Sequence, residues 1–130
     1  MTAFCRSGDR GIFSNWLCPI ILLVDDNIKF LGLLSSILKQ HFQVYEATGV
    51  QEAIKLLENI MIDAICSDFN MRDGTGLDLL KLWWQQDVQL PFMLMSASDD
   101  RHLENEGQSW GASFCCKTDF DLIAKIKEMV

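Results

Sequence analysis

Five short apolar runs recur along this chain, and each is followed by a segment in which apolar residues return at helical spacing. Runs that are nearly continuously apolar predict strands buried on both faces, which is typical of parallel sheets covered by helices. The predicted strands are residues 20–24, 42–47, 62–67, 91–96 and 112–116. The predicted helices are residues 28–41, a segment after Gly49 and Val50, and residues 76–86, 99–109 and 120–130.

This alternation predicts an α/β fold. Right-handed crossovers between successive parallel strands give a doubly wound five-stranded sheet of order 2-1-3-4-5, the flavodoxin-like arrangement. A chain of 130 residues suits one domain with a single core. Residues 1–18 show neither a helical nor a strand period, so we expect a partly ordered N-terminal arm ahead of a domain at residues 19–130.

Charge and hydropathy exclude several classes of partner. Eleven basic and eighteen acidic residues give a net charge of −7, which does not favour binding to nucleic-acid phosphates. No apolar run approaches the roughly 18 residues of a membrane span. Residues 1–10 lack the uninterrupted apolar stretch of a signal peptide. We therefore expect a cytoplasmic protein without a membrane or nucleic-acid partner.

Acidic residues follow two of the predicted strands. Asp25 and Asp26 end the first apolar run, and Asp68 ends the third, directly before a glycine-containing turn at residues 70–76. The carboxyl ends of parallel strands meet at one edge of the sheet, where open α/β folds bind ligands. Clustered carboxylates repel one another by a few kcal/mol per close pair at an effective dielectric of about 20. This edge therefore requires positive charge, and Asp68 is an exposed candidate nucleophile.

Ser96 and Lys117 end the fourth strand and follow the fifth, so a hydroxyl and an ammonium reach the same edge. Oxygen ligands of this kind suit Mg²⁺, which also takes phosphoryl oxygens. A carboxylate nucleophile can form an acyl phosphate. Mg²⁺ and Lys117 would neutralise the oxygens of the moving phosphoryl group, and Ser96 would donate a hydrogen bond to it.

Five motifs in order resemble a known family. They are Ile-Leu-Leu-Val-Asp-Asp-Asn at 21–27, the loop 68–76 followed by Leu-Asp-Leu-Leu, Met-Ser-Ala at 95–97, Trp-Gly-Ala at 110–112, and Phe114 three residues before Lys117. Over about residues 20–130 the chain resembles the receiver domain of two-component response regulators, the CheY-like fold.

The resemblance implies a phosphorelay role. Asp68 would accept a phosphoryl group from a histidine kinase or phosphotransfer protein, and Ser96 and Phe114 would form the switch pair. A downstream protein target would bind through the fourth helix, fifth strand and last helix, and a homodimer is left open. The implied Mg²⁺ ligands are Asp25, Asp26, Asp68 and the main-chain carbonyl of Asn70.

Two positions depart from the family pattern. Thr118 follows Lys117 where the family usually has proline with a cis bond. A cis bond without proline costs about 2.5–4 kcal/mol, so the isomer of this bond and the position of Lys117 stay open. Arg72 stands where proline is usual in the loop after Asp68, which is expected to loosen that loop.

Two other functions compete with phosphotransfer. A receiver-like scaffold could bind partners without phosphorylation, although it would be expected to have lost an acidic, hydroxyl or lysine position. A hydrolase of the haloacid-dehalogenase type would have Asp-x-Asp after the first strand, unlike Asp25-Asp26-Asn27. We expect no enzyme beyond autocatalysed phosphorylation and dephosphorylation, and a Lys117 that serves signalling more than stability. The cognate kinase, the output and any further domain stay open.

Overall fold

The computed structural model describes residues 19–84, 90–98 and 100–130. A five-stranded sheet in the order β2-β1-β3-β6-β7 forms its centre, and every neighbouring pair in it is parallel. Since β6 and β7 are the fourth and fifth strands of this sheet, the predicted order 2-1-3-4-5 is confirmed. The strands are β1 (Ile20–Val24), β2 (Gln43–Ala47), β3 (Ala64–Asp68), β6 (Phe92–Ser96) and β7 (Ser113–Cys116).

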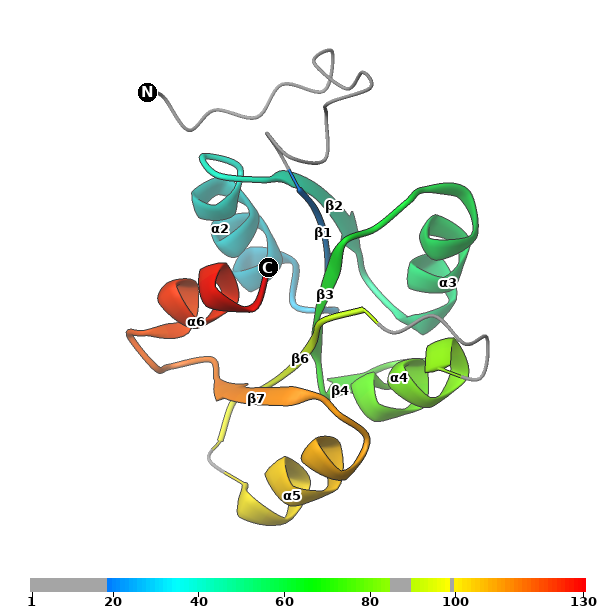
Figure 1. Cartoon of the computed structure of the whole chain (residues 1–130), viewed down its shortest axis with the longest axis vertical. Coiled ribbons are helices and arrows are strands. Elements are labelled where there is room, and N and C mark those ends of the chain that lie inside the picture. The colour runs from blue at the N-terminus through cyan, green and yellow to red at the C-terminus, as the bar shows by residue number, and fades with distance from the viewer. Residues whose placement is uncertain (1–18, 85–89, 99) are drawn as a thin grey trace.

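Helices cover both faces of the sheet, as Figure 1 shows. On one face lie α2 and α6, and on the other lie α3, α4 and α5. Their bounds are α2 (Ile28–Leu38), α3 (Val50–Asn59), α4 (Gly76–Trp84), α5 (Arg101–Ser109) and α6 (Leu122–Met129). The predicted N-terminal arm at 1–18, the end of the third predicted helix at 85–86 and the start of the fourth at 99 lie outside the described residues.

Two layers of apolar side chains separate the helices from the sheet. Because successive strand residues point to opposite faces, Ile21 and Leu23 of β1 pack towards α2 and α6, while Leu22 and Val24 pack towards α3 and α4. All five residues of β1 are buried, as expected for the second of five strands in a sheet covered on both faces. None of the helices among the described residues is long and apolar enough to cross a membrane.

The helix ends explain where the sequence prediction was right and wrong. Asn27 directly before the apolar helical pattern predicts a cap for α2, and this is confirmed, since its side chain accepts a hydrogen bond from the Phe30 amide at 3.2 Å. Apolar spacing over residues 120–130 predicts that Phe120 faces inward on the last helix, but its side chain is 93% exposed. The chain turns at Asp119, whose carboxylate accepts from the Asp121 amide, and α6 begins only at Leu122. Apolar spacing over residues 76–86 likewise predicts an inward Leu82, which is exposed.

A short hairpin follows β3, where the sequence predicted only a turn. Its strands are β4 (Asn70–Met71) and β5 (Gly74–Thr75), which pair antiparallel. Gly74 has a φ of +151°, a backbone conformation that residues other than glycine rarely adopt. The hairpin therefore needs glycine at this position, and it gives the loop after Asp68 a defined shape even with Arg72 in place of proline.

The least apolar helix, α5, lies against the sheet through a glycine. Leu103 and Gly107 are its only buried residues. A Cβ on Gly107 would lie 2.7 Å from Leu94 Cδ1, so the absence of a side chain lets the helix approach β6 closely. The helical cost of an interior glycine, about 1 kcal/mol relative to alanine, is thus offset by packing.

Candidate phosphoacceptor site

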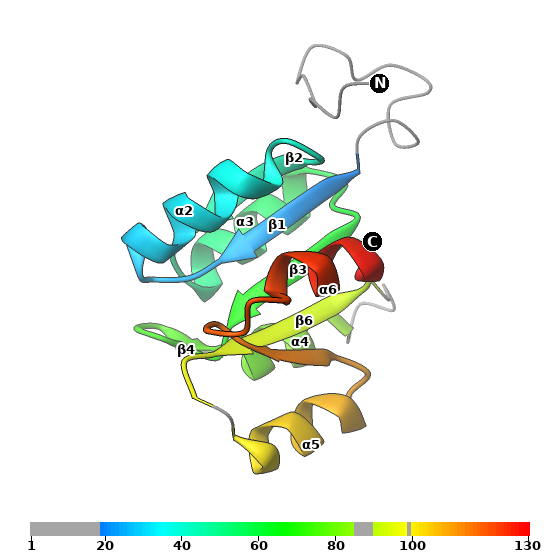
Figure 2. The same ribbon diagram turned by 90° about the vertical axis from the view of Figure 1, so that its left-hand side faces the viewer.

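Four strands deliver polar side chains to one edge of the sheet. Asp25 follows β1, Asp68 ends β3, Ser96 ends β6 and Lys117 follows β7. Figure 2 shows that the carboxyl ends of these strands lie on the same side of the molecule as the β4 hairpin. Backbone hydrogen bonds fix the register here, for example from the Phe69 amide to the Met95 carbonyl at 2.9 Å. The predicted convergence of these residues is therefore present.

Three carboxylates form a cluster at this edge. One oxygen each of Asp25, Asp26 and Asp68 lies within 4.8 Å of the others. Asp25 and Asp68 are buried, with 1% and 8% of their surface exposed, and Asp26 is half-buried. The expectation that Asp68 is exposed is therefore wrong, because the strand end lies under its neighbours at this edge. Buried carboxylates at this spacing repel one another and have lost hydration, so they need a cation nearby.

Lys117 supplies one positive charge. Its Nζ lies 2.6 Å from Asp25 Oδ2 and 3.2 Å from Asp68 Oδ1. The lysine side chain is itself largely buried, with 13% of its surface exposed. One ammonium between two buried carboxylates leaves the cluster with an excess of negative charge, because Asp26 adds a third carboxylate.

The balance of these effects is visible in the protonation of Asp68. Burial, followed by the charge of Asp25, raises the pKa of the Asp68 carboxyl above its ordinary value. The charge and hydrogen bond of Lys117 lower it but do not cancel the rise. A second cation would favour the charged carboxylate that a nucleophile requires.

The donor set fits a divalent metal ion. Asp25 Oδ1 accepts a hydrogen bond from the Asn27 amide at 2.9 Å. Asp25 Oδ2 is close to Lys117 Nζ, yet no donor among residues 19–84, 90–98 and 100–130 makes a well-aligned hydrogen bond to it. A buried carboxylate oxygen with unused lone pairs, beside oxygens of two further aspartates, is what Mg²⁺ binds through one or two carboxylates and water.

Comparison with known proteins identifies the family. Residues 21–127 match the response regulator receiver domain. The chain belongs to this family. Among curated relatives, the receiver domain is 26% identical over 114 residues to the response regulator SaeR of Staphylococcus aureus, covering 85% of this chain and 50% of that protein. It is 28% identical over 79 residues to the heme response regulator HssR of Staphylococcus saprophyticus, covering 60% of this chain and 35% of that protein.

Solved structures agree with this assignment. The chemotaxis response regulator CheY4 of Vibrio cholerae superimposes with a TM-score of 0.81 at 24% identity, covering 87% of this chain and 99% of that one. The non-phosphorylated HemR receiver domain of Leptospira biflexa gives a TM-score of 0.77 at 25% identity, covering 85% and 93%. The receiver domain spans half or less of the curated relatives' length, and nearly all of these two solved chains.

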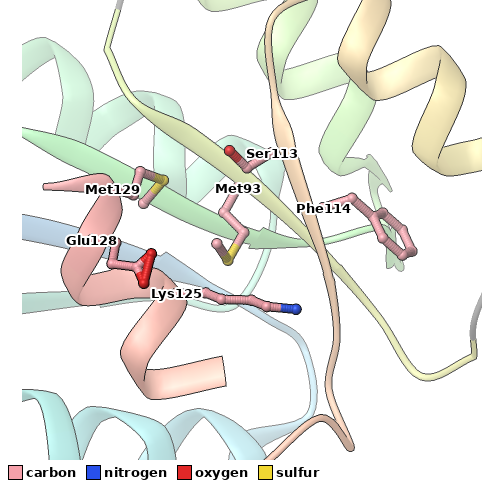
Figure 3. Close-up of a pocket in the computed structure, with 6 residues that line it drawn as sticks. All are labelled: Met93, Ser113, Phe114, Lys125, Glu128 and Met129. Carbon is pink, nitrogen blue, oxygen red and sulfur yellow. The ribbon is translucent and has the colours of Figure 1, made fainter. Parts of the chain in front are cut away.

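The predicted switch residues lie on neighbouring strands of this receiver domain. Ser96 is half-buried, and its Oγ accepts a hydrogen bond from the Ser98 amide at 3.3 Å. Phe114 is half-buried and packs on the α3 and α4 side of the sheet. In Figure 3 its ring points away from Met93 and Lys125, which lie on the other side of β7. Their roles as a switch pair remain a prediction.

Asn70 is placed at the same edge, two residues after Asp68, where β4 begins. Its carbonyl as a metal ligand remains a prediction. The Lys117–Thr118 bond, whose isomer the sequence leaves open, is trans, since the described residues contain no cis peptide bond.

The sequence does not reveal the groups that contact the end of β3, the strand that carries Asp68. The Ser67 hydroxyl is fully buried and donates to the Asp68 carbonyl at 2.9 Å. Beside it, a Cβ on Gly76 would lie 2.5 Å from that same carbonyl oxygen. The sequence around Ser67 is typical only of turn or cap chemistry, and no local pattern marks Gly76 as a close contact.

Asp73 ties the hairpin to α3. Its two carboxylate oxygens accept from the Val50 and Gln51 amides at 2.8 and 3.0 Å. Gly49, at the start of that helix, has no side chain to cap it, and a Cβ there would lie 2.7 Å from Asp73 Oδ1. These bonds lower the pKa of the Asp73 carboxyl. The loop expected to be loose is therefore anchored by a residue 23 positions away in sequence.

Proposed function

We propose that this receiver domain is a phosphoacceptor of a two-component phosphorelay, in which Asp68 takes the phosphoryl group. The observation that carries the proposal is the buried cluster of Asp25, Asp26 and Asp68 with Lys117 beside it at the carboxyl edge of the sheet. The phosphodonor is a histidine kinase or a phosphotransfer protein.

In the proposed reaction an oxygen of the Asp68 carboxylate forms a bond to phosphorus. The bond from phosphorus to the donor's histidine nitrogen breaks, and its electron pair returns to the imidazole. Lys117, already 3.2 Å from Asp68 Oδ1, is within reach of the phosphoryl oxygens that would form there and would neutralise part of their charge. Ser96 would donate its hydroxyl hydrogen to one of these oxygens after releasing the Ser98 amide.

Asp25, Asp26 and Asp68 would hold a Mg²⁺ ion, with the Asn70 carbonyl as a further ligand. When bound, the ion supplies charge neutralisation for the carboxylates and the phosphoryl oxygens. The buried Asp25 Oδ2, for which the described part of the chain provides no aligned hydrogen-bond donor, supports this assignment.

The domain would act once on itself rather than turn over an external substrate, so its chemistry would be limited to its own phosphorylation and dephosphorylation. A scaffold that never becomes phosphorylated is not favoured, because the acidic, hydroxyl and lysine positions are all present.

Two surfaces are proposed for protein partners. Ile28 begins α2 directly after the acidic pair and is 73% exposed, and Phe120, three residues beyond Lys117, is 93% exposed. These apolar side chains near the site would contact the phosphodonor. The downstream target would bind α5, β7 and α6, where Met93, Ser113, Lys125 and Met129 line a hollow of about 320 Å³ (Figure 3). A homodimer through this surface stays open.

Intact mass after incubation with Mg²⁺ and acetyl phosphate tests the proposal. Wild type should gain one phosphoryl group, and Asp68→Asn should gain none. Omitting Mg²⁺ should abolish the gain in wild type. Asp63→Asn is the matched control, because Asp63 precedes the same strand at its opposite end and accepts from the Ile20 amide, which the asparagine oxygen can still do. An equal gain in Asp68→Asn would refute the assignment.

A further inference from the structure

Phe30 lies against the ammonium group of Lys117. It is the third residue of α2, in the first turn after the acidic pair, and Lys117 Nζ is 4.7 Å from the centre of its ring. The Phe30 side chain is half-buried and packs on the apolar layer beneath α2 and α6. Its amide is held by the Asn27 cap, so the ring has a fixed base. At this distance the face of the ring attracts a cation.

The Lys117 ammonium therefore has two kinds of neighbour, carboxylates and an aromatic ring. The Asp25 and Asp68 carboxylates contact its ammonium at 2.6 and 3.2 Å, and the Phe30 ring lies against it as a third contact. A lysine side chain is long and flexible, with a compact and strongly hydrated charge. Holding it at one place requires contacts that outweigh hydration and rotamer entropy.

A divalent cation among the same carboxylates would weaken two of these three contacts. The ion would share the Asp25 and Asp68 oxygens and would repel the ammonium by like charge. The contact with Phe30 would be unaffected, because the ring has no oxygen that the metal can take. It also adds no negative charge that would compete with the cluster for the metal.

We infer that Phe30 is a positioning residue that keeps the Lys117 ammonium at the phosphoacceptor site when the acidic cluster is occupied by a metal. This role rests on the proposed function for its consequence, a faster phosphorylation of Asp68. The contact itself can be measured without any phosphorylation.

Nuclear magnetic resonance measures the contact directly. The Lys117 Hε protons should be shifted upfield by the Phe30 ring current, both in the metal-free protein and at saturating Mg²⁺. Phe30→Leu keeps an apolar side chain and should lose the shift, whereas Phe30→Tyr keeps the ring face and should retain it. Loss of the wild-type shift on adding Mg²⁺ would overturn the inference.

Phosphorylation by acetyl phosphate, which needs no docking partner, measures the consequence. Phe30→Leu should be phosphorylated about three- to tenfold more slowly than wild type, the range expected for losing a partly desolvated cation–ring contact. Phe30→Tyr should restore a rate close to that of wild type. Leu33→Ala is the matched control, because it also shortens an apolar side chain of α2. Leu33 is 62% exposed, so the rate of phosphorylation should stay close to that of wild type.

A double-mutant cycle separates positioning from a general effect on the fold. In a Lys117→Met background, replacing Phe30 with leucine should change the rate no further, since the partner of the ring is gone. An equal fall in both backgrounds, or a Phe30→Leu rate equal to wild type, would overturn the inference. If wild type takes up no phosphoryl group, the proposed function fails, and the ring-current measurement with and without Mg²⁺ still decides the role of Phe30.

Discussion

Two lysine–aspartate pairs of similar length and different burial allow the energetics of the site to be tested. Lys117 and Asp25 are 2.6 Å apart with 13% and 1% of their side chains exposed. Lys125 and Asp119 are 2.8 Å apart with 45% and 27% exposed. Replacing each lysine with methionine removes the charge and keeps an unbranched apolar side chain.

We expect Lys117→Met to lower the free energy of unfolding by about 3–5 kcal/mol in the absence of divalent metal, the usual cost of leaving a buried charge unpaired. At an effective dielectric of about 20, the gross attraction to Asp25 at 2.6 Å is about 6 kcal/mol, and that to Asp68 at 3.2 Å is about 5 kcal/mol. Desolvation of the ammonium offsets part of this attraction. The burial of the pair thus revises the expectation from the sequence that Lys117 contributes little to stability.

Chemical denaturation followed by circular dichroism measures the loss, with and without Mg²⁺. Because the metal binds the folded cluster, a concentration of 100 times its dissociation constant should return about 2.7 kcal/mol to Lys117→Met. Lys125→Met should lose far less, since its ion pair is exposed and screened by solvent. It should also show no additional recovery with Mg²⁺ beyond that of wild type.

The pH dependence has a definite sign. The folded pKa of Asp68 is raised, so its contribution favours folding below the unfolded value of about 3.9 and is lost as the pH rises through the folded value. Without Lys117, which lowers that pKa, the loss should extend to higher pH. Equal stability of Lys117→Met and wild type in EDTA at neutral pH would refute this account of the cluster.

Three further measurements follow from the packing. Gly76→Ala should destabilise the fold by about 1–3 kcal/mol, because its Cβ would lie 2.5 Å from the Asp68 carbonyl oxygen. Gly32→Ala, which has open space around its Cβ, should stabilise α2 by about 0.5–1 kcal/mol, and denaturation midpoints in the opposite order would contradict this. Asp73→Ala should lower the free energy of unfolding by about 1 kcal/mol at neutral pH. Because the pKa of Asp73 is lowered in the folded protein, this stabilisation should be present above pH about 3.9 and disappear as the pH falls through the folded pKa. A pH-independent difference between wild type and variant would refute the cap. An acyl-phosphate mimic should change amide exchange across residues 100–112, since α5 buries only Leu103 and Gly107; equal protection in both states would show that the signal leaves elsewhere.

The sequence allowed the sheet to be predicted because its strands carry a local signal. β1 and β6 agree with the predicted runs to within one residue, and their order follows from the handedness of crossovers. β3 differs more, since it starts two residues later and includes Asp68. The β4 and β5 hairpin was not predicted, because strands of two residues carry no period that could be recognised.

The buried faces of the helices were predicted less well than the strands. When a helix starts at a different residue from the predicted one, different residues belong to its buried face. On α6 the helix begins at Leu122, so Leu122 and Ile126 are buried and Phe120 lies before the helix. The start is set by the Asp119 carboxylate, which accepts from the Asp121 amide and pairs with Lys125. That arrangement depends on two side chains and one main-chain amide, and the apolar spacing alone does not reveal it.

The same distinction explains which site residues could be predicted. Asp25, Asp68, Ser96 and Lys117 each end or follow a strand, so the strand signal and the sheet order together bring them to one edge. Their neighbours have no such rule. Phe30 contacts Lys117, which lies 87 residues further along the chain. This contact depends on the orientation of α2 about its own axis against the sheet, and not on the residue at which α2 starts.

The contact between Asp73 and the start of α3 at Gly49 is another that local sequence patterns do not reveal. Each has an ordinary local explanation, a turn acid and a helix-start glycine, and only the structure shows that the glycine leaves room for the acid. Because Asp73 belongs to the loop that follows Asp68, its hydrogen bonds join this loop to the start of α3. A change at Asp68 that moved this hairpin would therefore also act on α3, in addition to the surface formed by α5, β7 and α6.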